Sequence, residues 1–293
     1  APSWVVSPRQ RVIAKLVPNS ELKRFDIELE FGVSASALEA AQKGTVSDGE
    51  MVYELDGKTY RTPIKTLRGD YRDADGNTAN GLRRWDKHDF KPRPDDIFQE
   101  RLYCIQWMGD STLNAYRPTT FFAEVTEEDL GREKQVEAIV AENLAHWQED
   151  GLVPDMPIDP GDKTDEPIRT RGWMYWQQLF SARHLLLLSM LRQKKISPQD
   201  DIFFCGCLNF TSRLTRWSVG SKGKPGVAPN GDFAAMVFSN QALNTFFTYA
   251  QRSFTELVDT YTISLKNFQL NMGYLVEPAE AISCSEVSDL YIT

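Results

Sequence analysis

The sequence has neither a long hydrophobic run nor an amino-terminal signal segment. The four consecutive leucines at 185–188, like every other apolar run, are far shorter than the ~20 residues of a membrane-spanning helix. No basic stretch followed by an apolar one opens the chain, as it would in a secretory signal. Because 41% of the residues are apolar and 25% are charged, the composition is that of a folded domain. We expect a soluble, cytoplasmic protein that does not bind membranes.

Cysteine and histidine are both scarce. The four cysteines and three histidines are Cys104, Cys205, Cys207, Cys284, His88, His146 and His184. The cysteines are too scattered for a disulfide scaffold, and none forms the CxxC spacing of a zinc site. The histidines lie far apart, which gives little support to a hydrolase triad or a histidine-rich metal site. We therefore expect buried, reduced thiols and no metal.

Glycine-rich phosphate loops are also missing. The sequence contains neither GxxxxGK[ST] nor GxGxxG. Phe204-Cys205-Gly206 resembles the start of the FxGxG loop of S-adenosylmethionine enzymes, but Leu208 replaces the second glycine. Because the pattern also falls inside a predicted helix, we interpret it as fortuitous.

Charge is distributed very unevenly along the chain. The net charge is −8 over 293 residues. Residues 124–168 hold 14 acidic and 3 basic side chains, whereas residues 169–224 hold 10 basic and 2 acidic ones. Phosphate binding is a local electrostatic effect that salt screens within ~10 Å. The sequence therefore permits DNA binding through residues 169–224 only.

Within that segment, cations and a tryptophan gather near its end. The candidate DNA contacts are Arg213, Arg216, Trp217, Lys222 and Lys224, followed by Arg183 and Lys194. Arginine and lysine bind phosphates, tryptophan stacks on bases, and glycines allow close backbone approach. Arg213 and Arg216 share one face of a helix that we predict from Ser197-Pro198 to about Trp217. The alternative is a solvent-exposed helix end, where the helix dipole stabilises the cations.

Aromatic residues cluster just before a predicted helix that Ser181 caps and that runs to Lys194. They are Trp173, Tyr175, Trp176 and Phe180. A base-stacking surface is one interpretation, but we favour packing at the helix entry.

The patterns predict an α+β fold in two regions. Residues 1–150 form a mixed, mostly β region with strands at 12–17, 25–31 and 102–108, a hairpin at 51–60, and helices at 34–42 and from Thr126 to Gly151. We expect the second helix to bury Val136, Ile139, Val140, Leu144 and Trp147. Residues 151–172 contain four prolines and read as an exposed linker. Residues 173–293 are predicted to be mainly helical, with a polar loop at 218–232 and helices between about 234 and 270.

The two ends suggest a piece of a longer protein. The chain begins with Ala1 and ends on Asp289-Leu290-Tyr291-Ile292-Thr293, which reads as a buried strand. We expect this strand to belong to an incomplete Rossmann-like sheet, so that its neighbours lie elsewhere. A homo-oligomer that covers this edge is left open.

Three stretches in this order carry a resemblance to a known family. They are residues 179–186 (LFSARHLL), residues 212–217 (SRLTRW) with the later Ser239-Asn240-Gln241-Ala242-Leu243, and the terminal 289–293 (DLYIT). Together with Pro2-Ser3-Trp4, Gly32-Val33-Ser34 and Lys43-Gly44-Thr45-Val46, they resemble the DNA adenine-specific methyltransferases that carry the DUF1156 domain. The likeness covers most of the chain.

The resemblance implies a function for the parent protein. In that family the strand is followed at once by a catalytic Asp-Pro-Pro-Tyr motif, which acts on an adenine flipped out of the duplex. The cofactor loop lies before the region that this chain resembles. The chain would thus be an insert of an S-adenosylmethionine-dependent adenine-N6 methyltransferase, inactive alone, with the remaining halves of the enzyme and DNA as partners. No catalytic residue and no cofactor of its own is carried onto it.

The chain departs from the family at one point. Many relatives have a zinc ribbon with a Cys-Pro-x-Cys knuckle after Gly-Thr-Val, whereas Gly44-Thr45-Val46 leads to residues 50–57 without any cysteine. A hairpin without thiolates lacks tetrahedral zinc ligands, so we predict a degenerate, metal-free hairpin. The competing hypothesis for the whole chain is a non-catalytic interaction module that docks a basic protein through residues 124–168.

Overall fold

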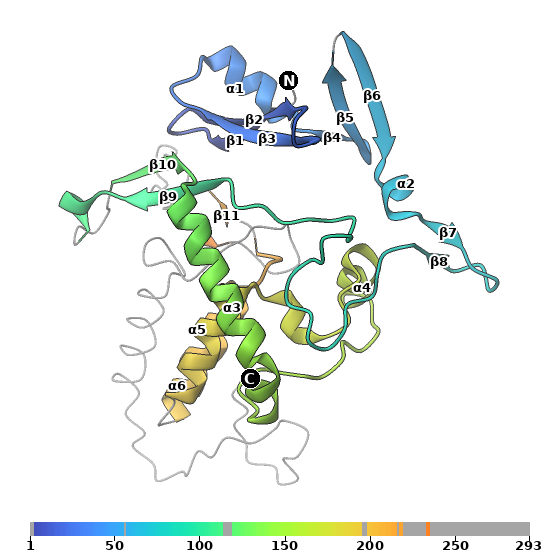
Figure 1. The fold of residues 1–293 in the computed structure, drawn as a ribbon, viewed down its shortest axis with the longest axis vertical. Helices are drawn as coiled ribbons and strands as arrows, with labels where there is room; N and C mark the ends of the chain where they lie inside the picture. The colour runs from blue at the N-terminus through green and yellow to red at the C-terminus, as the bar shows by residue number, and fades with distance from the viewer. Residues whose placement is uncertain are drawn as a thin grey trace, which may run out of the picture.

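The computed structural model describes residues 3–55, 57–113, 119–194, 198–215, 217–218 and 233–234. It is a mixed α+β fold with small antiparallel sheets (Figure 1). The strands are β1 (Ser3–Ser7), β2 (Val12–Asn19), β3 (Arg24–Glu30), β4 (Val46–Ser47), β5 (Glu50–Leu55), β6 (Lys58–Pro63), β7 (Tyr71–Arg72), β8 (Thr78–Ala79), β9 (Cys104–Met108), β10 (Thr120–Glu124), β11 (Trp217–Ser218) and β12 (Phe233–Ala234). The helices are α1 (Ala35–Gln42), α2 (Ile64–Arg68), α3 (Glu127–Glu149), α4 (Asp165–Arg171), α5 (Ala182–Gln193) and α6 (Pro198–Phe210).

The amino-terminal region follows its local sequence signals. β1, β2 and β3 form an antiparallel meander, in which Ile13 and Leu29 are buried. Ser34 caps α1 by accepting a hydrogen bond from the Ala37 amide at 3.1 Å, as its position before an apolar stripe predicts. β5 and β6 pair around Gly57, which confirms the predicted hairpin at 51–60. In Figure 1 it stands apart from α3, α5 and α6.

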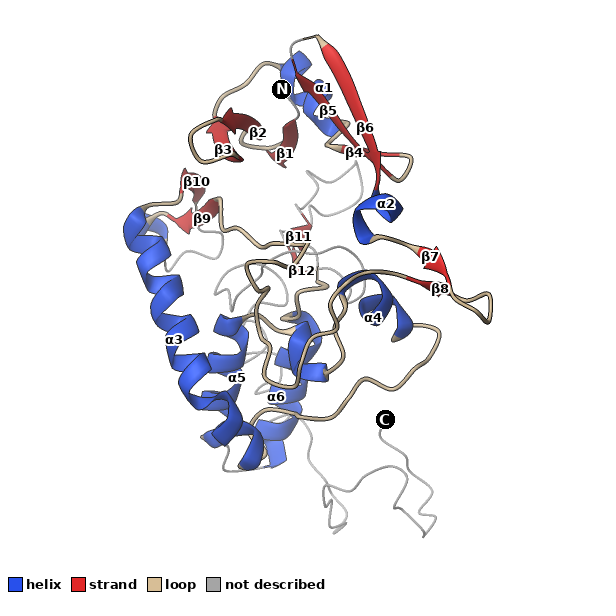
Figure 2. Cartoon of the chain, turned by 45° about the vertical axis from the view of Figure 1, so that its right-hand side comes forward, coloured by secondary structure: helices blue, strands red, loops and turns tan. Residues whose placement is uncertain are grey.

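The helical part is built on α3 and α5, which lie side by side in both views (Figure 2). Thr126 and Asp129 form the predicted capping box at the start of α3. Val140 and Leu144 are fully buried in a core that includes Leu185 of α5. Ile139, which we expected in the same stripe, is 41% exposed, because it lies one position away from Val140 and so turns about 100° from the core.

Residues 151–172 are not the exposed linker that their composition predicts. Val153 and Ile158 are buried, and Val153 joins the core of α3 and α5. The segment also contains α4 and bonds to both flanks, since the Trp85 amide donates to the Gly172 carbonyl at 2.8 Å and the Ile158 amide to Met174 at 2.8 Å. Prolines here shape an irregular packed segment, and the core continues across the predicted boundary.

The end of α6 differs from the prediction. The helix stops at Phe210 instead of continuing to about Trp217, and residues 211–215 form turns. The Thr211 hydroxyl donates to the Cys207 carbonyl at 2.8 Å, so a side chain takes over one of the last helical acceptors. Trp217 lies in β11, which pairs with β12. The predicted helices beyond 234 and the terminal strand with its Rossmann-like sheet lie outside the described residues.

No helix in the described part of the chain is both long enough and apolar enough to cross a membrane.

Candidate functional site

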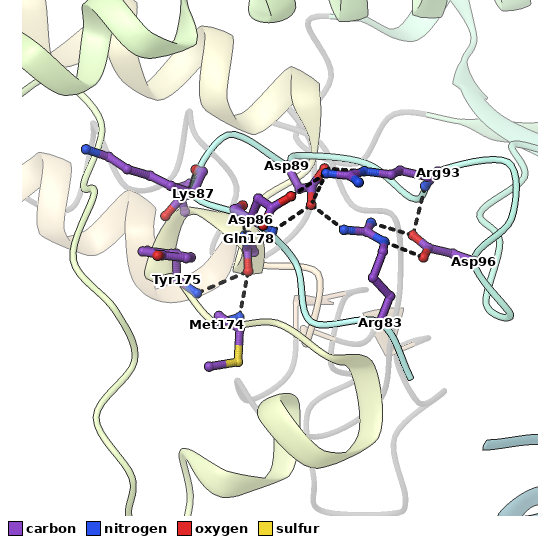
Figure 3. Close-up of polar contacts among 10 residues, drawn as sticks. Arg83, Asp86, Lys87, Asp89, Arg93, Asp96, Met174, Tyr175 and Gln178 are labelled. Atoms are coloured by element: carbon purple, nitrogen blue, oxygen red, sulfur yellow. Dashed lines mark hydrogen bonds and ion pairs between the residues drawn. The ribbon is translucent and has the colours of Figure 1, made fainter. Parts of the chain in front are cut away.

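The loop between β8 and β9 lies beside α4 in both ribbon views, and a network of charges gives it a defined shape (Figures 1–3). Arg83 pairs with Asp89 and holds Asp96 at 2.7 Å. Arg93 reaches Asp86 at 2.6 Å and Asp89 at 3.0 Å. The hydrogen bond from Arg83 holds the pKa of Asp96 below its ordinary value. The two arginines therefore pair with three aspartates within the loop, which leaves this set of side chains with a net charge of −1.

Two buried glutamines fix this loop to the segment before α5. The Gln178 side chain donates to the Asp86 carbonyl at 2.7 Å and accepts from the amides of Met174 at 2.7 Å and Tyr175 at 3.1 Å (Figure 3). Gln177 donates to the Lys87 carbonyl. Both glutamines are 0% exposed. Buried backbone groups need hydrogen-bond partners. In this loop the glutamine side chains supply them, in place of the backbone hydrogen bonds of a helix or sheet.

Arg213 lies between two tryptophans at the centre of this arrangement. Its guanidinium carbon is 5.7 Å from the ring centres of both Trp85 and Trp173. One Nη donates to Glu100 at 2.6 Å and the other to the Phe90 carbonyl. The side chain is 2% exposed, and burial lowers its pKa while Glu100 opposes that shift. Arg213 thus ties the loop, the segment before α5 and the end of α6 into one core.

This position corrects the prediction that Arg213 contacts DNA. An enclosed guanidinium with a carboxylate and a carbonyl as acceptors has no free edge at the surface for a phosphate. Arg213 is also not on a helix face, because α6 has ended three residues earlier.

The other candidate DNA contacts are in different situations. Arg183 of α5 forms an ion pair with Glu133 of α3 and is 34% exposed. Lys194, at the carboxyl-terminal end of α5, is exposed. Arg216, Lys222 and Lys224 lie outside the described residues, as does the side chain of Trp217. Of these candidates, the structure therefore places only the side chains of Arg183 and Lys194.

The aromatic residues before α5 serve packing, as we favoured. Trp173 is 2% exposed and meets Trp85 edge to face, with 6.1 Å between ring centres. Trp176 and Phe180 pack against the same cluster. This geometry leaves Trp173 without a face for a base.

His184 is fully buried at the start of α5. Its Nδ1 faces the Ser181 hydroxyl at 2.9 Å and accepts from the Ser181 amide at 3.3 Å, so it completes a capping box. Burial, and secondly the charge of Arg213, lowers its pKa to about 3. A histidine that stays neutral at this depth is a structural residue. Burial similarly raises the pKa of the Cys207 thiol to about 12, so that thiol is inert.

A cavity of about 50 Å³ opens beside the Arg213 core. Its lining includes Trp85, Phe98, Gln99, Arg171 and Trp173. Sequence reasoning did not single out Arg171, although it falls inside the basic segment 169–224. Its position at the end of α4, a helix that the linker prediction excluded, explains the omission.

The acidic stretch 124–168 lies along α3 and the irregular segment after it. Some of its carboxylates pair within the protein, such as Glu137 with Lys91 and Glu133 with Arg183. Glu142, Glu149 and Asp159 are exposed and have no ion-pair partner among the described residues. Part of this charge is therefore available at the surface.

Within the described ranges, no group of three or more histidine, cysteine or acidic side chains is arranged to hold a metal ion. The absence of a metal from the hairpin β5–β6 stays a prediction. Comparison with protein-family models, with curated proteins and with solved structures finds no match for this chain.

Proposed function

We propose that the chain is a section of an S-adenosylmethionine-dependent DNA adenine-N6 methyltransferase, where it supplies scaffold and DNA contacts. The cofactor and the catalytic motif belong to other parts of the parent enzyme. The sequence resemblance motivates this proposal, and the arrangement of its motifs in space supports it.

Two of the three resembling stretches are in direct contact. The Arg213 amide donates to the Leu179 carbonyl at 2.7 Å. Leu214 packs on the cluster that contains Leu179 and Phe180. Leu179 and Arg213 are 34 residues apart in the chain. Stretches that form one core over this distance behave as a single structural unit, which is the role that the proposal gives them.

The observation that carries the DNA-binding part is the pairing of β11 with β12. Trp217 is opposite Ala234 and Ser218 is opposite Phe233 in an antiparallel register. The two ends of the segment that holds Lys222 and Lys224 therefore meet at one place, directly after the Arg213 core. This pairing holds the two ends of the basic segment together, which is a suitable way to present cations to a phosphate backbone.

In this proposal, Arg216, Lys222 and Lys224 bind phosphates and Trp217 stacks on a base. Arg183 and Lys194 have a secondary role, because Arg183 already pairs with Glu133. Arg213 is a scaffold residue.

A salt titration tests the DNA contacts. We compare the protein with the triple variant Arg216→Ala, Lys222→Ala, Lys224→Ala. The matched control removes three exposed lysines from elsewhere, with Lys58→Ala, Lys65→Ala and Lys163→Ala. Each lost phosphate contact should reduce the slope of log K against log salt by about 0.9. We expect a reduction of about 2 to 3 for the first variant only. Equal slopes for both variants would reject the assignment.

Reading the gene beyond the codon for Thr293 tests the enzymatic part. We expect the next codons to encode Asp-Pro-Pro-Tyr or a close variant. A stop codon there would remove the strongest support for a methyltransferase.

The second candidate function is a protein-interaction module, which the exposed carboxylates of α3 favour. Charge reversal at Glu142 and Glu149 should then abolish capture of a basic partner, and the protein should not bind DNA at low salt. DNA binding that survives this reversal would argue for the first function instead.

A further inference from the structure

The cavity beside the Arg213 core has one cation that the protein does not neutralise by contact. Arg83, in its wall, is already paired with Asp89 and Asp96. Glu100, also in its wall, is committed to Arg213. Arg171 forms no hydrogen bond or ion pair with any residue in the described part of the chain. The carboxylates of the cavity are therefore already in ion pairs, whereas the Arg171 guanidinium is in none with a described residue.

The surroundings of Arg171 leave its donors open. Its guanidinium carbon lies 5.5 Å from the ring centre of Phe98, so the ring covers the face of the cation. A guanidinium has five N–H donors in its plane, and a ring on its face satisfies none of them. Burial lowers the pKa of Arg171, against the influence of Glu100 and Glu166. A half-buried arginine with open donors is matched by an oxyanion, which accepts two parallel hydrogen bonds.

Other donors line or flank the same place. Trp85 and Trp173 both line the cavity, and neither indole N–H donates a hydrogen bond to a described residue. Arg84, which lies in the chain between the lining residues Arg83 and Trp85, donates to the Ile168 carbonyl of α4. Asn80 donates to the Arg169 carbonyl at 2.5 Å, which places Arg169 beside the start of the loop that contains Arg84. Arg84 and Arg169 are exposed and have no carboxylate partner among the described residues.

The size of the cavity limits what can enter. About 50 Å³ is several times the ~10–15 Å³ that a cavity needs in order to hold one water molecule. A group of a few non-hydrogen atoms, such as one phosphate, matches this space. The surface cations Arg84 and Arg169 favour a phosphate that is part of a longer polyanion.

We propose that the Arg171 cavity receives a single phosphate group of the DNA backbone, with Arg84 and Arg169 facing the neighbouring phosphates. This inference rests on the proposed DNA-binding function and adds a contact site outside residues 213–224. A free phosphate ion offers the same oxygens as a phosphate of the DNA backbone, so it is the alternative ligand of the cavity.

Two titrations on four proteins test the proposal. The proteins are the wild type, Arg171→Gln, Arg171→Lys and the control Arg61→Gln, which removes an exposed cation from the distant strand β6. Inorganic phosphate is titrated against chloride at equal ionic strength and followed by tryptophan fluorescence, since Trp85 and Trp173 line the cavity. Duplex DNA is titrated by anisotropy over a range of salt concentrations. Thermal melts establish that each variant is folded at the assay temperature.

We expect saturable phosphate binding by the wild type and by Arg61→Gln. Arg171→Gln should weaken it at least tenfold, as the loss of a charged hydrogen bond implies, and should reduce the DNA salt slope by about 1. Arg171→Lys keeps the charge but loses the planar fork, so it should weaken phosphate binding and keep most of the slope. If Arg171→Gln does not fold, the weaker phosphate binding expected of Arg171→Lys still tests the site.

Three results would overturn the inference. If Arg171→Gln matches Arg61→Gln in both titrations while DNA still binds, the cavity is not a phosphate site and the proposed function stands. If phosphate binding depends on Arg171 but DNA binding does not, the cavity takes free phosphate only. If the wild type binds no DNA at low salt, the proposed function fails together with this inference.

Discussion

Arg213 illustrates, at the scale of single residues, how the chain uses a buried charge. Its cation is enclosed by two indole rings and compensated by Glu100, whose side chain is 29% exposed. Breaking a buried ion pair by removing one partner is costly because the other charge loses its compensation. The residue that the sequence most readily assigns to DNA is thus a structural one.

Arg213→Ala should therefore lower the free energy of unfolding by about 3 kcal/mol, because it opens a cavity and leaves Glu100 unpaired. The slope of log K for DNA against log salt should not change in the folded protein. Urea denaturation and salt titration measure the two quantities, with exposed Lys58→Ala as a control that stays within about 0.5 kcal/mol. A lower salt slope with unchanged stability would restore Arg213 as a DNA contact.

His184 predicts how stability depends on pH. Its pKa is about 3 in the folded state and near 6.5 in the unfolded chain. Below pH 6.5 the unfolded state therefore binds a proton that the folded state does not. The contribution of neutral His184 is complete above pH 6.5 and is lost progressively as the pH falls toward 3, by about 2 kcal/mol at pH 5.

His184→Gln isolates this effect from the carboxylates. Glutamine is a usual third residue of a capping box, so it can accept from the Ser181 amide without titrating. We expect the variant to lose less stability than the wild type between pH 7 and pH 5 in urea denaturation. Parallel pH profiles for the two proteins would contradict the assignment.

The contact between α3 and α5 is the main packing unit at the scale of elements. Leu144 is 2% exposed within this core, whereas Ile139 on the same helix is 41% exposed. Leu144→Ala should lower the free energy of unfolding by about 3 kcal/mol, and Ile139→Ala by less than about 1 kcal/mol. Urea denaturation followed by both circular dichroism and tryptophan fluorescence checks this difference. Equal effects would mean that α3 does not pack on α5 through this face.

Local signals account for the elements that the sequence predicts well. The Thr126–Asp129 capping box and the Ser34 cap act over three residues, and the alternation in β3 acts over two. The loop between β8 and β9 has no such signal, because its order comes from contacts such as Gln178 to Asp86, 92 residues apart. Arg213 and Glu100 are separated by 113 residues. Their burial, and with it the Arg171 cavity, follows from tertiary contacts that no local pattern encodes.

At the scale of the whole molecule, basic and acidic side chains are concentrated in different parts of the chain. The structure uses part of the basic segment internally, in Arg213 and Arg183. The remaining cations of this segment that the structure describes are Arg169, Arg171, Arg192 and Lys194. The exposed carboxylates Glu142 and Glu149 lie on α3, outside this basic segment. This separation of charge is the physical basis of the proposed DNA-binding role.

Methyl transfer to adenine is the activity that the proposed function requires of the parent protein. The protein encoded by the complete gene is incubated with S-adenosylmethionine and duplex DNA, and N6-methyladenine is quantified by mass spectrometry. We predict that N6-methyladenine forms, and that the triple variant at Arg216, Lys222 and Lys224 raises the KM for DNA more than it lowers kcat. A folded protein that binds DNA and S-adenosylmethionine but leaves adenine unmethylated would contradict the account.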